Sequence, residues 1–321
     1  MQIIFYGAPG TGKSYIVDEL VKASGASDDR IFRTTFHPEY TYNDFVGQLL
    51  PKVQRTASGS TIINYEFTKG VFTRALEKAY EDTSKQVFLI IEEMSRGDCA
   101  SIFGDIFQLL DRESQGINKG YSKYFINNDI IAKDIIALTD DKIKWPPNFN
   151  ILGTVNTSDQ NVFVMDTAFK RRFEWQYVST KPVPAGGPYK NNIDIEVVID
   201  SAGTKKTVKW VDLYGTLNIF IADSRFLGLG EDKQLGQFFI EFKVGGTPSE
   251  HKNQVKNKLL HYLWSDIHKS SYSTEISLFD SSITSFSELY DAYENDRKIF
   301  SDKFIECIEL WLRGSLWFPG E

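Results

Sequence analysis

The stretch MQIIFYGAPGTGKSYIVDEL, residues 1–20, is the part of the sequence that decides the fold. Ile3–Tyr6 is a short apolar run typical of a buried strand, and the residues from Lys13 to about Ala23 predict a helix. The segment between them fits the pattern G-x-x-x-x-G-K-[ST]. Strand, loop and helix in this order predict a phosphate-binding loop made of Gly7, Ala8, Pro9, Gly10, Thr11, Gly12, Lys13 and Ser14.

The residue types of this loop suit a nucleoside triphosphate. Glycines allow backbone N–H groups to turn toward phosphate oxygens, and the following helix directs the positive end of its dipole at the same anion. Lys13 can supply a positive charge to the β- and γ-phosphates, and the Ser14 hydroxyl is a candidate ligand of Mg²⁺. The alternative is a chance glycine turn before a helix, which the flanking strand and helix argue against.

A pair of carboxylates follows a second buried run. Val87–Ile91 predicts a strand, and Glu92 and Glu93 come directly after it. We assign Glu92 to Mg²⁺ and Glu93 to the base that accepts a proton from the attacking water. Glu92 is one methylene longer than the Asp common in such motors. The alternative interpretation is two solvated charges at a strand end.

A third buried strand, Phe149–Val155, leads into Asn156. An amide at this strand end can orient the attacking water and contact the γ-phosphate. Asp159 either takes part in the same chemistry or caps the following helix. The sequence leaves these two roles for Asp159 open.

Basic residues end the next predicted helix, Met165–Phe173. Cations at a helix C-terminus are explained by the helix dipole alone. Arg171 and Arg172 are also candidates for an arginine finger that reaches the γ-phosphate of a neighbouring subunit. We favour a finger for one of the two, and the sequence does not choose between them.

The strands alternate with helices, which indicates a parallel sheet covered on both faces. Proline and glycine cluster at 182–188 and mark a domain boundary. We therefore expect a core at 1–182, an inserted hairpin or linker at 183–210, and a helical domain at 211–321. Further expectations are a polar hairpin-like piece around 56–60, a helix over Ala100–Leu110, an irregular insertion at 113–148, a hairpin over Glu196–Trp210, and helices over Leu213–Ala222, Gln254–Lys269 and Phe286–Leu312.

Composition narrows the functional classes. The net charge of −7 argues against a surface built mainly to coat nucleic acid. The chain has two cysteines, so a disulfide scaffold is not expected and a cytoplasmic location fits. No apolar run approaches the ~20 residues of a membrane span. The four histidines lack metal-ligand spacing, which leaves Mg²⁺ as the expected metal.

These motifs, in this order, resemble the AAA+ superfamily, and within it the McrB branch of GTP-using motors from modification-dependent restriction systems. The resemblance covers about residues 3–270. It is carried by the phosphate loop and by FHPEYTYNDFVGQLLP (Phe36–Pro51), IIEEMSRGDCASIFGDIFQLLD (Ile90–Asp111), GTVNTSDQ (Gly153–Gln160), DTAFKRRF (Asp166–Phe173) and LGQFF (Leu235–Phe239).

The resemblance implies an α/β P-loop AAA+ domain with a parallel sheet flanked by helices, plus a mainly helical C-terminal lid domain. It also implies a hexameric ring of identical subunits, and an McrC-like partner that stimulates hydrolysis and carries or recruits a nuclease. DNA would be recognised through a domain or subunit absent from this chain. Three positions depart from the family pattern: Val155 replaces Met, Gln160 replaces the signature Arg, and Gln237 replaces a frequent His.

The substrate and the client stay open at this point. The resemblance favours GTP, but phosphate loops do not read the base and the chain has no Asn-Lys-x-Asp guanine motif, so ATP is the alternative. The favoured function is a restriction motor that couples hydrolysis to DNA translocation and nuclease activation. A MoxR-like or dynein-like remodelling ATPase acting on proteins is the main alternative, and a module that uses nucleotide only to assemble is another.

Overall fold

The computed structural model describes residues 1–55, 61–135, 138, 140–158, 163–184, 189–271 and 276–315. Contacts between residues divide the chain into two compact units. The first unit contains Met1–Tyr6 and Lys13–Tyr177, and the second contains Gly7–Gly12 and Val178–Glu321.

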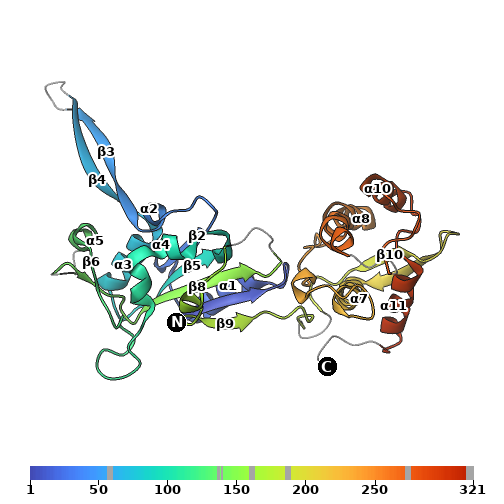
Figure 1. The fold of residues 1–321 in the computed structure, drawn as a ribbon, viewed down its shortest axis with the longest axis horizontal. Helices are drawn as coiled ribbons and strands as arrows, with labels where there is room; N and C mark the ends of the chain where they lie inside the picture. The colour runs from blue at the N-terminus through green and yellow to red at the C-terminus, as the bar shows by residue number, and fades with distance from the viewer. Residues whose placement is uncertain are drawn as a thin grey trace. The chain divides into compact units, whose positions relative to one another are not determined.

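The first unit is built on a five-stranded sheet with the order β2-β5-β8-β1-β9 (Figure 1). The pairs β2–β5, β5–β8 and β1–β9 are parallel. The predicted α/β fold with a parallel sheet and flanking helices is therefore confirmed. The strands are β1 (Gln2–Gly7), β2 (Ile31–Thr35), β5 (Val87–Glu92), β8 (Phe149–Asn156) and β9 (Glu174–Tyr177).

The central strands are buried on both faces, which explains their continuous apolar sequences. Helices α1 (Lys13–Ala23) and α3 (Val71–Glu81) pack beside the sheet, and a short 3-10 helix over Asp28–Arg30 precedes β2. Part of the core is an aromatic cluster in which each ring is fully buried, formed by Phe36, Phe45, Phe72, Phe103 and Phe149. Edge-to-face and tilted ring pairs in this cluster stabilise the unit beyond the burial of apolar area.

Two predicted helices of this unit are shorter than expected. The expected helix Ala100–Leu110 is α4 (Cys99–Phe103) followed by a tighter 3-10 segment, because Gly104 adopts a φ of 48°. The expected helix Met165–Phe173 is reduced to α6 (Thr167–Lys170), whose first turn is capped by the Asp166 side chain. Strand β9 was not predicted, since its sequence EWQY lacks the apolar run of the central strands.

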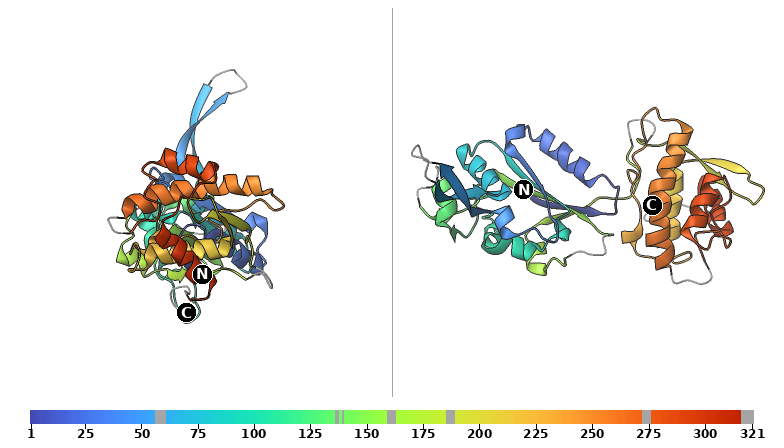
Figure 2. Two further views of the ribbon diagram at one scale, coloured as in Figure 1. Left: turned by 90° about the vertical axis from the view of Figure 1, so that its right-hand side faces the viewer. Right: turned by 90° about the horizontal axis from the view of Figure 1, so that it is seen from above.

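A long hairpin extends from the first unit between α2 (Tyr42–Phe45) and α3. It consists of β3 (Gly47–Arg55) and β4 (Thr61–Lys69), and it stands clear of the sheet in Figures 1 and 2. The expected polar hairpin-like piece around 56–60 lies outside the described residues, and the sequence did not predict the strands on either side of it. Pro51 weakened the strand signal, because proline is confined to edge strands.

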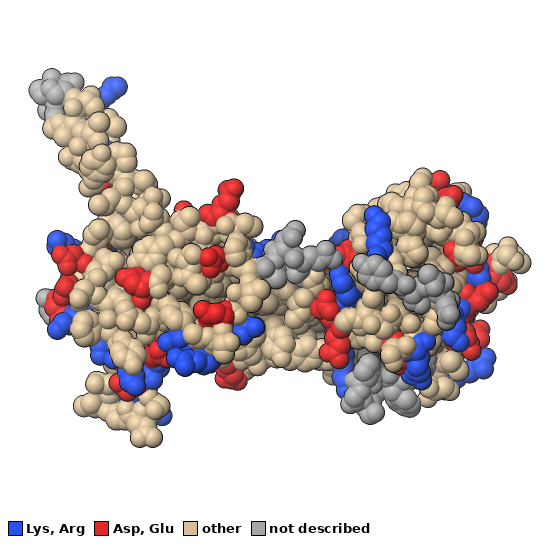
Figure 3. All heavy atoms as spheres, viewed as in Figure 1, with Lys and Arg blue, Asp and Glu red and all other residues tan. Residues whose placement is uncertain are grey.

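The two faces of this hairpin differ in chemistry. The register places Leu49, Pro51 and Val53 opposite Phe67, Tyr65 and Ile63 on one face. The other face has polar pairs, including a 2.6 Å ion pair between Lys52 and Glu66. Figure 3 shows a largely uncharged surface on the hairpin.

The described residues of the insertion at 113–148 have little regular structure, as expected. It contains α5 (Asp129–Asp134) and a two-strand pair of β6 (Ile126–Asn127) and β7 (Lys142–Ile143). The half-buried Arg112 guanidinium anchors it by donating hydrogen bonds to the carbonyls of Gly120, Pro146 and Phe149. Burial lowers the pKa of Arg112 to about 10, so this guanidinium stays charged at neutral pH.

The second unit is mainly helical and carries the predicted hairpin. Strands β10 (Asp194–Val198) and β11 (Lys205–Lys209) are antiparallel, and α7 (Trp210–Ala222) follows directly. The other helices are α8 (Pro248–Gln254), which continues through π-type turns and α9 (Leu260–Tyr262) to Ile267, then α10 (Phe286–Glu294) and α11 (Asp302–Leu312); short 3-10 helices cover Glu231–Lys233 and His268–Ser270.

The expectation of one helix over Phe286–Leu312 is wrong. Asp296 adopts a left-handed φ of 52° after α10, and Ser301 caps the start of α11. The chain turns between the two helices, so both can bury an apolar side against the same core. That core is centred on Trp210, Tyr214 and Phe304. No helix in the described ranges has the length and apolar character needed to cross a membrane.

Candidate nucleotide site

The loop from Gly7 to Gly12 leaves the end of β1 and adopts a conformation that requires glycine. Gly10 and Gly12 have φ values of 77° and 88°, in the left-handed region that disfavours other residues. Inside the loop, the Thr11 hydroxyl donates a 3.0 Å hydrogen bond to the Ala8 carbonyl. Local sequence therefore determines the shape of the predicted phosphate loop.

The loop belongs to the second unit, and another segment of the same unit is hydrogen-bonded to it. We call Leu235–Phe239 the clasp segment. The backbone N–H of Gly236 donates to the Pro9 carbonyl at 2.9 Å, and that of Phe238 donates to the Gly10 carbonyl at 2.8 Å. A Cβ on Gly236 would lie 2.2 Å from the Gly10 carbonyl carbon, so only glycine fits this approach. The sequence does not predict this contact between the motif LGQFF and the phosphate loop.

Gln237, which departs from the family pattern, lies in the interior of the second unit. Its side chain is buried, and its Oε1 accepts a 2.7 Å hydrogen bond from the Val183 N–H. Its carbonyl accepts hydrogen bonds from Trp210 Nε1 and Asn191 Nδ2, both at 2.8 Å. These contacts give Gln237 a structural role in fixing the clasp segment.

In the first unit, α1 begins with Lys13 and Ser14. Lys13 is buried, with 8% of its surface exposed. The Ser14 hydroxyl donates a 3.0 Å hydrogen bond to Glu92 Oε2 at the end of β5. The Thr154 hydroxyl donates to the same oxygen at 2.5 Å. Ser14 and Glu92, the two candidate Mg²⁺ ligands from the sequence, are thus hydrogen-bonded to each other, and Thr154 is hydrogen-bonded to the same carboxylate.

The chemistry of this group fits Mg²⁺. Hydroxyl and carboxylate oxygens are the donors that a hard divalent cation prefers. Neighbouring ligands of an octahedral Mg²⁺ at ~2.1 Å stand about 3 Å apart. The Ser14 and Glu92 oxygens have a separation of 3.0 Å, which matches this spacing.

Glu93 occupies a strained position directly after β5. Its φ of 52° is left-handed, a conformation that costs a non-glycine residue energy and is found at functional sites. Its N–H donates to the Thr154 hydroxyl at 3.2 Å, and its Oε1 accepts a 2.6 Å hydrogen bond from Asn156 Nδ2. Arg96 Nε lies 3.4 Å from Glu93 Oε2. The structure therefore brings Glu93 and Asn156 together.

Thr154 and Arg96 were not among the candidate residues. Thr154 precedes Asn156 by two positions on β8, and such residues project from the same face of a strand. Strand alternation was therefore a usable signal for Thr154. Arg96 lies three residues after Glu93 in a 3-10 turn, which the sequence did not predict. Asp159 lies outside the described residues, as does Gln160.

The two candidate fingers differ in their surroundings. Arg172 donates to Asp111 Oδ2 at 2.6 Å and to the Ala168 carbonyl at 2.8 Å, and its guanidinium lies 4.1 Å from the centre of the Phe107 ring. Only 10% of the Arg172 side chain is exposed. Arg171 is exposed, and no hydrogen bond or ion pair to its side chain is found among the described residues. Of the two, Arg171 can reach another molecule.

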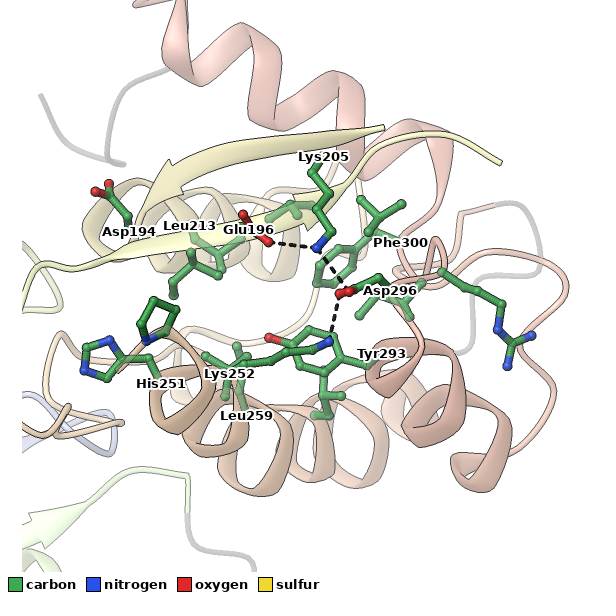
Figure 4. A pocket seen from close by; sticks show the side chains of 18 of the residues that line it. Asp194, Glu196, Lys205, Leu213, His251, Lys252, Leu259, Tyr293, Asp296 and Phe300 are labelled. Atoms are coloured by element: carbon green, nitrogen blue, oxygen red, sulfur yellow. Dashed lines mark hydrogen bonds and ion pairs between the residues drawn. The ribbon is translucent and has the colours of Figure 1, made fainter. Parts of the chain in front are cut away.

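The second unit also has a cavity of about 220 Å³ between its hairpin and helices (Figure 4). Lys205 bridges Glu196 and Asp296 at 2.9 and 3.1 Å, and Lys252 lies 2.8 Å from Asp296. Lys205 and Lys252 at this cavity are thus both paired with carboxylates of the same unit. Acidic and basic side chains at this cavity pair with one another, and the rest of its lining is mainly apolar. The cavity therefore does not resemble a phosphate site.

Comparison with known proteins agrees with this geometry. Residues 2–173 match the family of AAA domains, dynein-related subfamily. The chain is 36% identical over 321 aligned positions to the type II restriction enzyme BsuMI component YdiS of Bacillus subtilis, covering 93% of this chain and 87% of that protein. It is 26% identical over 175 positions to the type IV methyl-directed restriction enzyme EcoKMcrB subunit of Escherichia coli, covering 54% of this chain and 34% of that protein.

Proposed function

The chain belongs to the dynein-related subfamily of AAA domains and is an AAA+ ATPase related to restriction-system components, and we propose that it is the ring motor of an McrBC-like DNA restriction system. In this role it hydrolyses a nucleoside triphosphate, with GTP favoured and ATP as the alternative. Hydrolysis drives DNA translocation and activates a partner nuclease. The proposal that the chain hydrolyses nucleotide rests on two contacts at the carboxyl ends of the strands, Ser14–Glu92 and Asn156–Glu93.

The proposed chemistry divides between neighbouring side chains. Lys13 and the loop Gly7–Gly12 bind the phosphates, while Ser14 and Glu92 would hold Mg²⁺. When bound, that ion neutralises charge on the phosphate oxygens. Glu93 takes the proton of the attacking water, and Asn156 holds the Glu93 carboxylate through Oε1. The role of Glu93 as the base is supported by its 2.6 Å hydrogen bond from Asn156 and by its left-handed backbone, which is a conformation found at functional sites.

In the proposed ring, an arginine finger of one subunit completes the nucleotide site of its neighbour. We assign it to Arg171, since Arg172 is engaged by Asp111 and Ala168 within its own subunit. A finger supplied by a neighbour makes hydrolysis depend on assembly. A hexamer of identical subunits fits this requirement, and an McrC-like protein would join the ring as the stimulating and nuclease subunit.

Two relatives are named as restriction-enzyme components, which supports DNA rather than a protein as the molecule on which the motor acts. DNA would be recognised through a domain or subunit other than the units described above. The chain's acidic balance of 36 basic against 43 acidic residues agrees with recognition elsewhere.

The test is turnover of ATP and GTP side by side, with and without double-stranded DNA and the protein encoded next to this chain. We expect GTP turnover that the neighbouring protein raises by at least ~tenfold, the scale of one strong transition-state contact. Turnover that is insensitive to DNA and to that protein, but stimulated by a protein substrate, would identify a remodelling ATPase instead.

A further inference from the structure

Arg33 is a charged, exposed residue on the outermost strand of the sheet that the proposed chemistry does not use. It lies on β2 and pairs in register with Ile90 of β5, two residues before Glu92. Residues two apart on a strand project from the same face, so Arg33 shares a face with Glu92. Its guanidinium donates to Glu92 Oε1 through Nη1 and to Asp18 Oδ1 on α1 through Nη2.

With these contacts, both oxygens of the Glu92 carboxylate accept hydrogen bonds. Oε2 accepts hydrogen bonds from the hydroxyls of Ser14 and Thr154, at 3.0 and 2.5 Å. Oε1 accepts from Arg33. A glutamate has one more rotatable bond than an aspartate and loses more freedom when it is fixed. Donors on both oxygens hold this longer side chain in one orientation.

The charges of the group are balanced in a way that suits a cation ligand. Arg33 alone would neutralise Glu92 and compete with a metal for it. Asp18 binds the other arm of the same guanidinium, so Asp18, Arg33 and Glu92 together keep one net negative charge. Arginine suits this bridge because its planar fork can serve two carboxylates at once, whereas a lysine ammonium lacks that fixed geometry.

We propose that Arg33 is a positioning residue that fixes Glu92 beside Ser14 so that the pair can hold nucleotide-bound Mg²⁺. This role rests on the proposed function, because it requires a triphosphate and its metal at this edge of the sheet. Arg33 acts through Glu92 and does not touch the phosphates in this account. The residue therefore compensates for the extra methylene of Glu92.

Two effects of removing Arg33 have opposite signs, which makes the proposal testable. Loss of a nearby positive charge would, by Coulomb attraction alone, strengthen Mg²⁺ binding. Loss of the orientation of Glu92 would weaken it. Removing a residue that orients a metal ligand typically reduces metal affinity by about 10–100-fold. We expect the second effect to dominate, since Arg33 and Asp18 are 39% and 47% exposed and their charges are screened by solvent.

The experiment measures binding of the fluorescent analogues mant-AMPPNP and mant-GMPPNP to the full chain as Mg²⁺ is titrated. Arg33→Gln should raise the half-saturating Mg²⁺ concentration by about tenfold, with the affinity measured in EDTA unchanged. Arg33→Lys should show a smaller rise, because its ammonium can still donate a hydrogen bond to Glu92, although it loses the fork that binds Asp18 as well. The control Arg225→Gln removes an exposed arginine that pairs with Asp223 two residues away, and it should behave as the wild type.

A double-mutant cycle separates positioning from a general effect on stability. If Arg33 acts through Glu92, Arg33→Gln should change the Mg²⁺ requirement by less than ~twofold in a Glu92→Gln background. Equal shifts in both backgrounds would overturn the proposal, and so would an unchanged or lower Mg²⁺ requirement in Arg33→Gln alone. If Arg33→Gln does not fold, the same comparison is made with Arg33→Lys.

A wild type that binds neither analogue would overturn the proposed function itself. A wild type that binds, with Arg33 variants that need no more Mg²⁺ than it does, would overturn only the role of Arg33.

Discussion

Arg171 and Arg172 are adjacent in the chain and have different environments. Arg172 packs against Phe107 and pairs with Asp111, whereas Arg171 faces solvent. A sequence of two arginines at a helix end cannot distinguish these roles, because the difference lies in a partner about sixty positions away. The surrounding packing decides which residue stabilises the subunit.

Substitution of each arginine should therefore give opposite results. Arg172→Ala removes a mostly buried ion pair and should lower the free energy of unfolding by about 2 kcal/mol. Arg171→Ala should change it by less than ~0.5 kcal/mol, as expected for an exposed side chain, and lower turnover by about 10³-fold. Urea denaturation and steady-state hydrolysis measure the two effects. Wild-type turnover in Arg171→Ala would remove the finger from the account.

Among the structural elements, those with strong local patterns were predictable. The strand–loop–helix at the start of the chain and the strands ending in Glu92 and Asn156 follow from apolar runs and motif spacing. The long hairpin β3–β4 was not, because its strands have one exposed apolar face and a proline. Contacts of Arg33 and Thr154 with Glu92 depend on sheet order and register, which local periodicity does not contain.

The clasp segment gives a test at the scale of elements. Gly236→Ala places a Cβ against the Gly10 backbone, so the phosphate loop or the clasp segment must shift. We expect the affinity for nucleotide to fall by at least ~tenfold, since binding requires the loop to keep its shape. Equilibrium binding of a fluorescent nucleotide measures this loss.

Gly203→Ala is the matched control for that substitution. Gly203 lies in the same unit, and a Cβ added there has nothing within 4 Å. Its left-handed φ of 84° means that alanine introduces backbone strain without touching the loop. If both variants lose nucleotide affinity equally, the clasp contact is not the cause.

For the whole molecule, the account depends on residues far apart in the chain acting on one nucleotide. The glycine loop, the acidic pair Glu92 and Glu93, and the amide of Asn156 come from the ends of three separate strands, β1, β5 and β8. In parallel sheets, ligands bind outside the carboxyl ends of the strands, where these side chains gather. The proposed ring adds Arg171 of a neighbouring subunit, so assembly and hydrolysis should rise together.

The most direct test of the central claim is single-turnover hydrolysis of γ-labelled ATP and GTP by the wild type and by Glu93→Gln, with nucleotide binding measured on the same samples. We expect Glu93→Gln to bind nucleotide with an affinity within ~threefold of the wild type and to hydrolyse it at least ~10²-fold more slowly, the contribution of a general base. Hydrolysis at the wild-type rate in Glu93→Gln would contradict the assignment of Glu93 as the base and, with it, the proposed mechanism.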